Sequence, residues 1–305
     1  MKLSVVTPYY DDFHEATGTI QTVRQSLGPC SDVELITVDV KPSASLPKAK
    51  NHGMKISSGD AVLFLYPGIF PLDGSVQTLL SCLNDDPELA AVCGRWSNAR
   101  GKVEVGYNVR RFPTFCALLF DILLLNKILA ANPITRRYKM HDFDHQSAIA
   151  AEHASACVFM VRREVAERLG GFDERYVPGW FDQLDFCHAL HQAQCRIRFE
   201  PEAQFISNEN VPLVNRIVAD QYPSYRHSEL LYIRRRFGSV AWRFARICVA
   251  IGMIERLLFS VTLPESIRRW FIRSYRVYVS DEYIKKLRSA YWSVLKDSVL
   301  GRQQT

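Results

Sequence analysis

Short apolar runs alternate with amphipathic segments over most of the chain, and this alternation predicts strands that alternate with helices. The apolar runs have the length of buried strands, and the segments between them repeat their apolar positions with a helical period. The predicted strands lie at 3–7, 33–38, 61–65, 89–93, 156–161 and 197–200, and the predicted helices at 15–27, 48–57, 76–83, 164–169 and 184–192. Parallel strands joined by crossover helices are the simplest topology for this order. The sequence therefore predicts an α/β fold around a central sheet.

Two parts of the chain depart from this alternation. Residues 97–152 are irregular, except for an apolar helix expected near 115–130. From Tyr222 onward the sequence is typical of basic helices. We therefore expect one α/β domain over residues 1–225 and a helical C-terminal region over residues 226–305.

The positive charge of the chain is confined to the C-terminal region. Residues 226–305 hold 16 Lys and Arg against 6 Asp and Glu, a balance of +10, whereas the whole chain carries +6. The first 225 residues therefore sum to −4. Such a basic region favours an anionic neighbour, with a membrane surface as the first candidate. A solvated helical face that binds nothing explains the same charge equally well.

No segment is expected to span a bilayer. The most apolar stretch, 240–263, is interrupted by four charged residues, and its longest uncharged run covers only 247–254, whereas a span requires about 20 apolar residues. The N-terminus leads directly into a predicted strand, without the pattern of a signal peptide. We expect a cytoplasmic protein that attaches peripherally to the inner face of the cytoplasmic membrane.

The 8 cysteines are typical of reduced, buried thiols. None forms a C-x-x-C pair, and most lie in apolar runs. We expect neither a zinc site nor a disulfide framework.

Polar and aromatic residues follow the first three predicted strands. Pro8 and Tyr10 follow the first strand, Asp39 the second, and Tyr66 and Gly68 the third. The carboxyl ends of parallel strands meet at one edge of the sheet, where α/β folds bind nucleotides. A tyrosine there can stack on a base, and a carboxylate can accept a hydrogen bond from a base or a ribose. Packing of the tyrosines and a turn at the aspartate explain the same residues singly.

The second predicted helix begins with Lys48, Lys50 and Asn51. Helix N-termini and lysines attract phosphate groups, which makes these residues candidates for the phosphate side of a nucleotide site. A solvated first turn is the alternative, and the sequence alone favours it.

Carboxylates cluster before the predicted helix at 184–192. The run Gly-Gly-Phe-Asp-Glu at 170–174 is followed by Trp180, Asp182, Gln183 and Asp185. A general base that deprotonates a sugar hydroxyl requires a carboxylate in such a place. Asp182 is the first candidate and Asp185 the second. N-terminal capping of the helix is the alternative, and each carboxylate taken alone favours it.

These motifs, in this order over residues 3–240, resemble the family 2 inverting glycosyltransferases of the GT-A fold, most closely its rhamnosyltransferase-like members. The motifs are P-Y-Y-D at 8–11, Asp39, K-N-H-G at 50–53, L-F-L-Y-P-G at 63–68, G-G-F-D-E at 170–174, F-D-Q-L-D-F-C at 181–187 and P-E-A at 201–203. The resemblance implies a Rossmann-like mixed sheet flanked by helices, with a C-terminal helical appendage. It also implies transfer of a sugar from a nucleotide-diphospho-sugar to a glycan or lipid-linked acceptor in cell-surface polysaccharide synthesis. Nucleic acid is not an expected partner.

The resemblance also assigns roles to the candidate residues. Tyr10, beside Pro8, would stack on the base, and Asp39 would hydrogen-bond it. The remaining positions divide between the donor side, with Lys50, Asn51, Tyr66 and Gly68, and the acceptor side, with Trp180 and Gln183.

The departures from the family pattern concentrate at the chemistry. Gly68 stands where the family has a metal-binding carboxylate, and Ser207 where it often has a metal-binding histidine. Gln183 occupies the usual position of the base. We therefore do not expect an essential divalent metal such as Mn²⁺ or Mg²⁺. Protein cations would then neutralise the leaving diphosphate, with Lys48, Lys50, Arg110, Arg111 and the segment Tyr225-Arg226-His227 as candidates.

The same departures permit a second hypothesis. A catalytically degenerate member of the fold would bind a nucleotide, a glycan or a partner enzyme without turnover. A dinucleotide-dependent oxidoreductase is not favoured, because no G-x-G-x-x-G follows the first strand.

Overall fold

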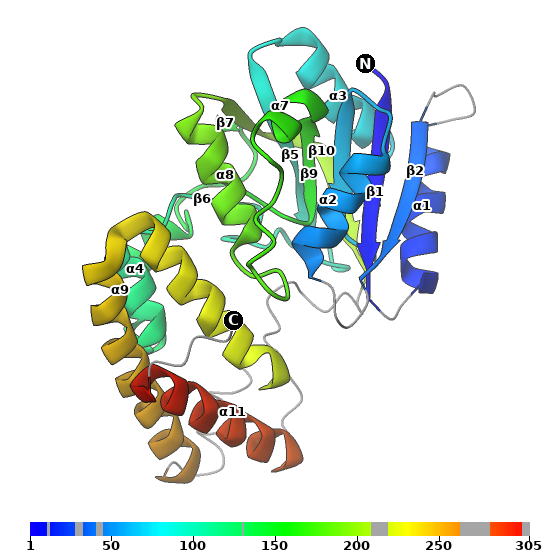
Figure 1. Ribbon diagram of the computed structural model, residues 1–305. Coiled ribbons are helices and arrows are strands. Elements are labelled where there is room, and N and C mark those ends of the chain that lie inside the picture. The colour runs from blue at the N-terminus through cyan, green and yellow to red at the C-terminus, as the bar shows by residue number, and fades with distance from the viewer. Residues whose placement is uncertain are drawn as a thin grey trace. The chain divides into compact units, whose positions relative to one another are not determined.

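The computed structural model describes residues 1–10, 13–27, 33–40, 45–129, 131–208, 219–262 and 281–300. The chain forms two compact units (Figure 1). The first contains Met1–Phe112 and Arg136–Val211, and the second contains Pro113–Thr135 and Pro212–Thr305. The apolar segment near 115–130 thus belongs with the C-terminal helices.

The first unit is built around a mixed sheet. Its strands are ordered β2 (Val33–Asp39), β1 (Leu3–Tyr9), β3 (Ala61–Leu65), β9 (Val158–Arg162), β5 (Leu89–Ser97), β10 (Arg196–Ser207) and β4 (Ile69–Pro71), with β7 (Ile149–Ala150) paired to β10. β1 runs parallel to both β2 and β3, which confirms the predicted crossovers at this edge. β9 runs antiparallel to β3 and β5, so the sheet is mixed, as the resemblance implied, although the alternation of strands and helices alone favoured parallel strands. A separate ribbon pairs β6 (Val109–Arg110) with β8 (His153–Ala154).

The helices of this unit agree with the predicted ones, with shifted ends. They are α1 (Phe13–Leu27), α2 (Leu46–Ile56), α3 (Ser75–Asp85), α7 (Arg163–Arg168) and α8 (Asp182–Gln192), while α6 (Pro133–Tyr138) joins the two units along the chain. α2 begins two residues earlier than predicted, because the Ser45 side chain accepts from the Lys48 backbone N–H and Pro47 lies in the first turn. α8 also begins earlier, at Asp182.

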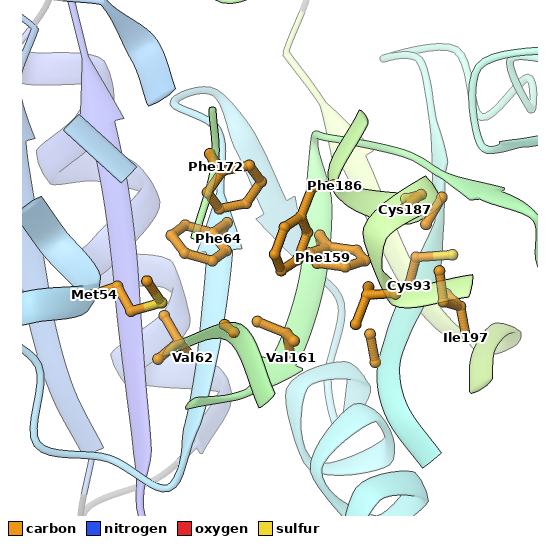
Figure 2. Close-up of a cluster of buried hydrophobic side chains, with 14 of the residues drawn as sticks. Met54, Val62, Phe64, Cys93, Phe159, Val161, Phe172, Phe186, Cys187 and Ile197 are labelled. Atoms are coloured by element: carbon orange, nitrogen blue, oxygen red, sulfur yellow. The ribbon is translucent and has the colours of Figure 1, made fainter. Parts of the chain in front are cut away.

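Aromatic side chains fill the core between the sheet and α8 (Figure 2). The Phe172 ring lies 5.2 Å from Phe64 and 4.5 Å from Phe186, and Phe186 meets Phe159 edge to face at 6.1 Å. Each such ring, once buried, stabilises the fold by about 2–3 kcal/mol. Phe172 belongs to the 170–174 run, so the core fixes this loop beside the carboxyl edge of the sheet.

The cysteines of the described residues are free thiols. Burial raises the pKa of Cys187 to about 12 and that of Cys157 to about 12. These thiols are therefore protonated and unreactive at neutral pH.

The second unit is helical. It contains α4 (Phe115–Ile122), α5 (Leu125–Ile128), a short 3-10 turn at Ala219–Gln221, α9 (Tyr222–Thr262) and α11 (Asp281–Leu300). Gly238, with φ 86° and ψ 179°, divides α9 into two helical segments, and Figure 1 shows the sharp bend between them. By length and composition alone, Tyr222–Ser260 of α9 is long and apolar enough to cross a membrane. The sequence had predicted no segment of this kind. In its most apolar window 28% of the residues are buried.

Candidate functional site

The carboxyl ends of β1, β2 and β3 bring the predicted nucleotide-side residues to one edge of the sheet. Tyr9 pairs with Asp39 across β1 and β2, and the Val40 N–H donates to the Tyr9 carbonyl at 2.7 Å. Tyr10 follows directly and is 43% exposed, while Asp39 is exposed. Tyr66 follows β3 and is half-buried. A stacking ring and an exposed carboxylate thus stand on neighbouring strand ends.

A buried ion pair lies beside this edge. Lys50 Nζ of α2 lies 2.8 Å from Asp182 Oδ2 of α8, and the two side chains are 0% and 3% exposed. The ammonium also lies 3.5 Å from Gln183 Oε1. Removing an ammonium from water costs several kcal/mol unless a counter-charge compensates it. Asp182 therefore neutralises Lys50, and each holds the other in place.

Two aromatic rings enclose the ammonium. Lys50 Nζ lies 4.4 Å from the centre of the Phe172 ring and 5.9 Å from that of Tyr66. The negative faces of the rings add to the stabilisation of the cation. Lys50, predicted on the nucleotide side, instead belongs to the interior of the site.

The negative charge of Asp182 reaches both tyrosines of the edge. Although Tyr10 as a whole is 43% exposed, withdrawal of its phenol from water, and next the charge of Asp182, raise its pKa to about 12. The same two causes, in the same order, raise the pKa of Tyr66 well above its ordinary value. Both phenols are therefore neutral at physiological pH. The Tyr10 hydroxyl donates to the Pro178 carbonyl at 3.2 Å, which fixes its ring.

Asn51 fastens the loop before α8. Its Nδ2 donates to the Phe172 carbonyl at 2.8 Å and to Glu174 Oε1 at 3.0 Å, and its Oδ1 accepts from the Phe172 N–H at 2.8 Å. Gly171 has φ +72°, and a Cβ there would lie 2.5 Å from Asn51 Oδ1. Asn51 was predicted on the nucleotide side, but these bonds give it a structural task in the loop.

The same loop closes over the start of α2 and ends at the mouth of α8. The Leu46 N–H donates to the Pro178 carbonyl at 2.7 Å. The half-buried Trp180 follows, and then Phe181, a non-glycine residue with φ 71°. Side chains seldom adopt this left-handed region, which is strained and common at functional sites. The strained residue directly precedes Asp182.

Capping does not account for the carboxylates of α8. The N-cap position is Phe181, which makes no side-chain cap. Asp182 and Asp185 lie in the first turn and are 2% and 4% exposed. The positive end of the helix favours both charges, but the contact of Asp182 is the ion pair with Lys50.

The two positions that resemble metal ligands lie side by side. Ser207 pairs across β10 and β4 with Ile69, the neighbour of Gly68. Gly68, with φ 75°, donates its N–H to Thr19 Oγ1 at 2.8 Å and accepts from the Asn208 N–H at 2.9 Å. Neither position carries a carboxylate or an imidazole. Within the described ranges, no three His, Cys, Asp or Glu side chains are grouped to hold a metal ion.

The candidate cations differ in what they contact. Arg110 donates to the Gly106 carbonyl and lies 4.9 Å from the Tyr107 ring, while Lys48 and Arg111 are exposed. Arg226 belongs to the second unit, where it pairs with the buried Glu229. In the first unit, Lys48 and Arg111 are thus the candidates that remain open to a ligand.

The chain was compared with known proteins. No family model matches it, and no curated protein matches it significantly. Among solved structures, it is similar to the mannosyltransferase PcManGT from Pyrobaculum calidifontis, which was determined with GDP-mannose and Mn²⁺. The identity is 11%, the match covers 99% of this chain and 88% of that one, and the TM-score is 0.49. A likeness at this level does not assign an activity.

Proposed function

We propose that the first unit is a glycosyltransferase of the GT-A type. It binds a nucleotide-diphospho-sugar at the carboxyl edge of β1, β2 and β3 and transfers the sugar, with inversion, to a hydroxyl of a glycan or a lipid-linked acceptor. We expect the transfer to take place at the inner face of the cytoplasmic membrane, during the synthesis of a cell-surface polysaccharide.

One observation carries this proposal. The carboxylate of Asp182 lies at the mouth of α8, and its charge reaches Tyr10 and Tyr66 at the strand ends. Within the described part of the chain, Asp182 accepts a hydrogen bond from Lys50 Nζ through its oxygen Oδ2. We assign acceptance of the proton to the other oxygen of this carboxylate, Oδ1.

In the proposed reaction the acceptor hydroxyl oxygen attacks the anomeric carbon, and its proton passes to Asp182. The bond from that carbon to the diphosphate oxygen breaks, and the nucleoside diphosphate leaves with the electron pair. Tyr10 stacks on the base, Asp39 accepts from it, and Trp180 and Gln183 face the acceptor. Lys48 and Arg111 neutralise the leaving diphosphate, a task for which preorganised cations are effective.

A second candidate is a degenerate transferase that binds its ligand without chemistry. The 3% exposure of Asp182 and its pairing with Lys50 favour this alternative. Turnover over a panel of uridine, guanosine and thymidine diphospho-sugars, each with Mn²⁺ and with EDTA, separates the two. The first proposal expects turnover that EDTA does not abolish. Binding without turnover of any donor would support the degenerate protein.

A further inference from the structure

Six apolar side chains form a continuous exposed stripe on the second helical segment of α9, residues 239–262. They are Val240 (79% exposed), Phe244 (51%), Ile247 (60%), Ile251 (46%), Ile254 (47%) and Leu258 (56%). Their spacing alternates between four and three residues, which places all six on one face of the helix. The opposite face is buried, with Ala245, Cys248, Val249 and Met253.

Two of the four charged residues that interrupt this stretch of sequence, Arg246 and Arg256, point away from the stripe. Arg256 donates to the Ile122 carbonyl at 2.6 Å and to the Asp121 carbonyl at 3.1 Å, at the end of α4. Arg246 donates to the Ser298 carbonyl in the last turn of α11 at 2.7 Å. Both arginines thus donate to carbonyls in the last turns of neighbouring helices, α4 and α11. These two arginines therefore do not interrupt the exposed apolar face, which the exposed Arg243 borders.

The surroundings of the stripe are cationic. Residues 230–262 contain six Arg and one Glu. Arg234, Arg235 and Arg243 are exposed, whereas Glu255 is partly buried. An anionic surface is therefore the complementary partner, and repulsion opposes the pairing of two copies of this face.

We propose that this stripe docks α9 onto an anionic membrane surface. The helix lies in the plane of the surface, with the six apolar side chains at the boundary of the acyl chains and the exposed arginines among the headgroups. This inference names the surface behind the membrane location in the proposed function, but it depends on neither nucleotide binding nor chemistry.

Flotation of the full-length protein with lipid vesicles tests the proposal. We expect the protein to float with vesicles that contain about 30% phosphatidylglycerol and not with phosphatidylcholine alone. The Ile247→Asn/Ile254→Asn variant is expected to bind vesicles at least about tenfold less tightly, because it loses two apolar side chains that enter the membrane. Arg243→Gln is expected to bind severalfold less. The matched control is Ile56→Asn, an equally exposed isoleucine (50%) at the end of α2, which should float like the unchanged protein.

Each other outcome overturns the proposal. Equal flotation of the stripe variant and the control would remove the stripe from membrane binding, as would failure of the unchanged protein to float. A dimer by light scattering that becomes a monomer in the stripe variant would assign the stripe to a second copy. Circular dichroism checks that each variant is folded. Nucleotide binding, measured on the same samples, reports separately on the proposed function.

Discussion

Lys50 Nζ and Asp182 Oδ2 lie 2.8 Å apart, with both side chains almost fully removed from solvent. The pair joins α2 to α8 across 132 residues of sequence. The Lys50 ammonium also lies 4.4 Å from the Phe172 ring of the core and 5.9 Å from the Tyr66 ring at the edge of the candidate site. The ion pair thus belongs both to the stability of the first unit and to the chemistry proposed for it.

Loss of one partner should cost far more than loss of both. Lys50→Met leaves an uncompensated buried carboxylate and is expected to lower the free energy of unfolding by about 3–5 kcal/mol. The double variant Lys50→Met/Asp182→Leu should recover most of that loss, because no unpaired charge remains. Urea denaturation measures both. The surface pair of Arg136 with Asp142 is the control, and Arg136→Gln should cost at most about 1 kcal/mol. If the loss of unfolding free energy in the double variant equalled the sum of the losses in the two single variants, the two groups would not interact.

Asp182→Asn should reduce turnover by about 10²–10⁴-fold, the usual contribution of a general base, while nucleotide affinity stays within severalfold. Lys50→Met is the control for lost stability, since it breaks the same pair but keeps the carboxylate. Steady-state rates and calorimetry give the two quantities. Equal losses of turnover in the two variants would mean that the pair acts only as a structural element.

The ring of Tyr10, and not its hydroxyl, should carry nucleotide affinity. Tyr10→Ala is expected to lose about 1–3 kcal/mol of binding, the worth of one stacked base. Tyr10→Phe keeps the ring, loses only the bond to the Pro178 carbonyl, and should bind within severalfold of the unchanged protein. Titration with nucleoside diphosphates compares them. Equal affinity of Tyr10→Ala would place the base elsewhere.

Glu229 should make the stability of the protein depend on pH. Burial is the largest cause that raises its pKa from 4.5 to about 7. The native state therefore keeps a proton that the unfolded state releases, so stability falls as the pH rises from about 4.5 to about 7. The unchanged protein should lose up to about 3 kcal/mol over this range relative to Glu229→Gln. Denaturation at several pH values measures the difference. A constant difference would contradict the raised pKa.

Gly171 and Gly170 form a matched pair for the loop before α8. Both have positive φ, but an added Cβ meets Asn51 only at Gly171. Gly170→Ala should cost about 1–2 kcal/mol from the left-handed backbone alone. Gly171→Ala should cost clearly more and should also weaken nucleotide binding, since the loop carries Trp180 and leads to Asp182. If Gly170→Ala and Gly171→Ala changed the unfolding temperature and the nucleotide affinity equally, Asn51 would not fix the loop.

The parallel part of the fold was predictable from the sequence, because buried strands and their crossover helices impose clear hydrophobic periods. β1, β2 and β3 follow that pattern, and so does the meeting of Tyr10, Asp39 and Tyr66 at one edge. The antiparallel β9 was not predictable, since an apolar strand does not record its direction.

The contacts of the site were harder to foresee. Nothing in the local sequence pairs Lys50 with Asp182, and a lysine at a helix start ordinarily suggests solvent or phosphate. The roles of Asn51 and of the arginines in α9 depend likewise on carbonyls from distant segments. Counting charges along 240–263 therefore missed a face that is apolar in three dimensions.

Isothermal titration of the full-length protein with uridine, guanosine and thymidine diphospho-sugars tests the central claim most directly. We predict heat of binding for at least one donor, unchanged by EDTA, and an affinity that is about 1–3 kcal/mol weaker in Tyr10→Ala. No heat for any donor, or binding that requires Mn²⁺, would contradict a nucleotide-sugar site without a metal at the carboxyl edge of β1, β2 and β3.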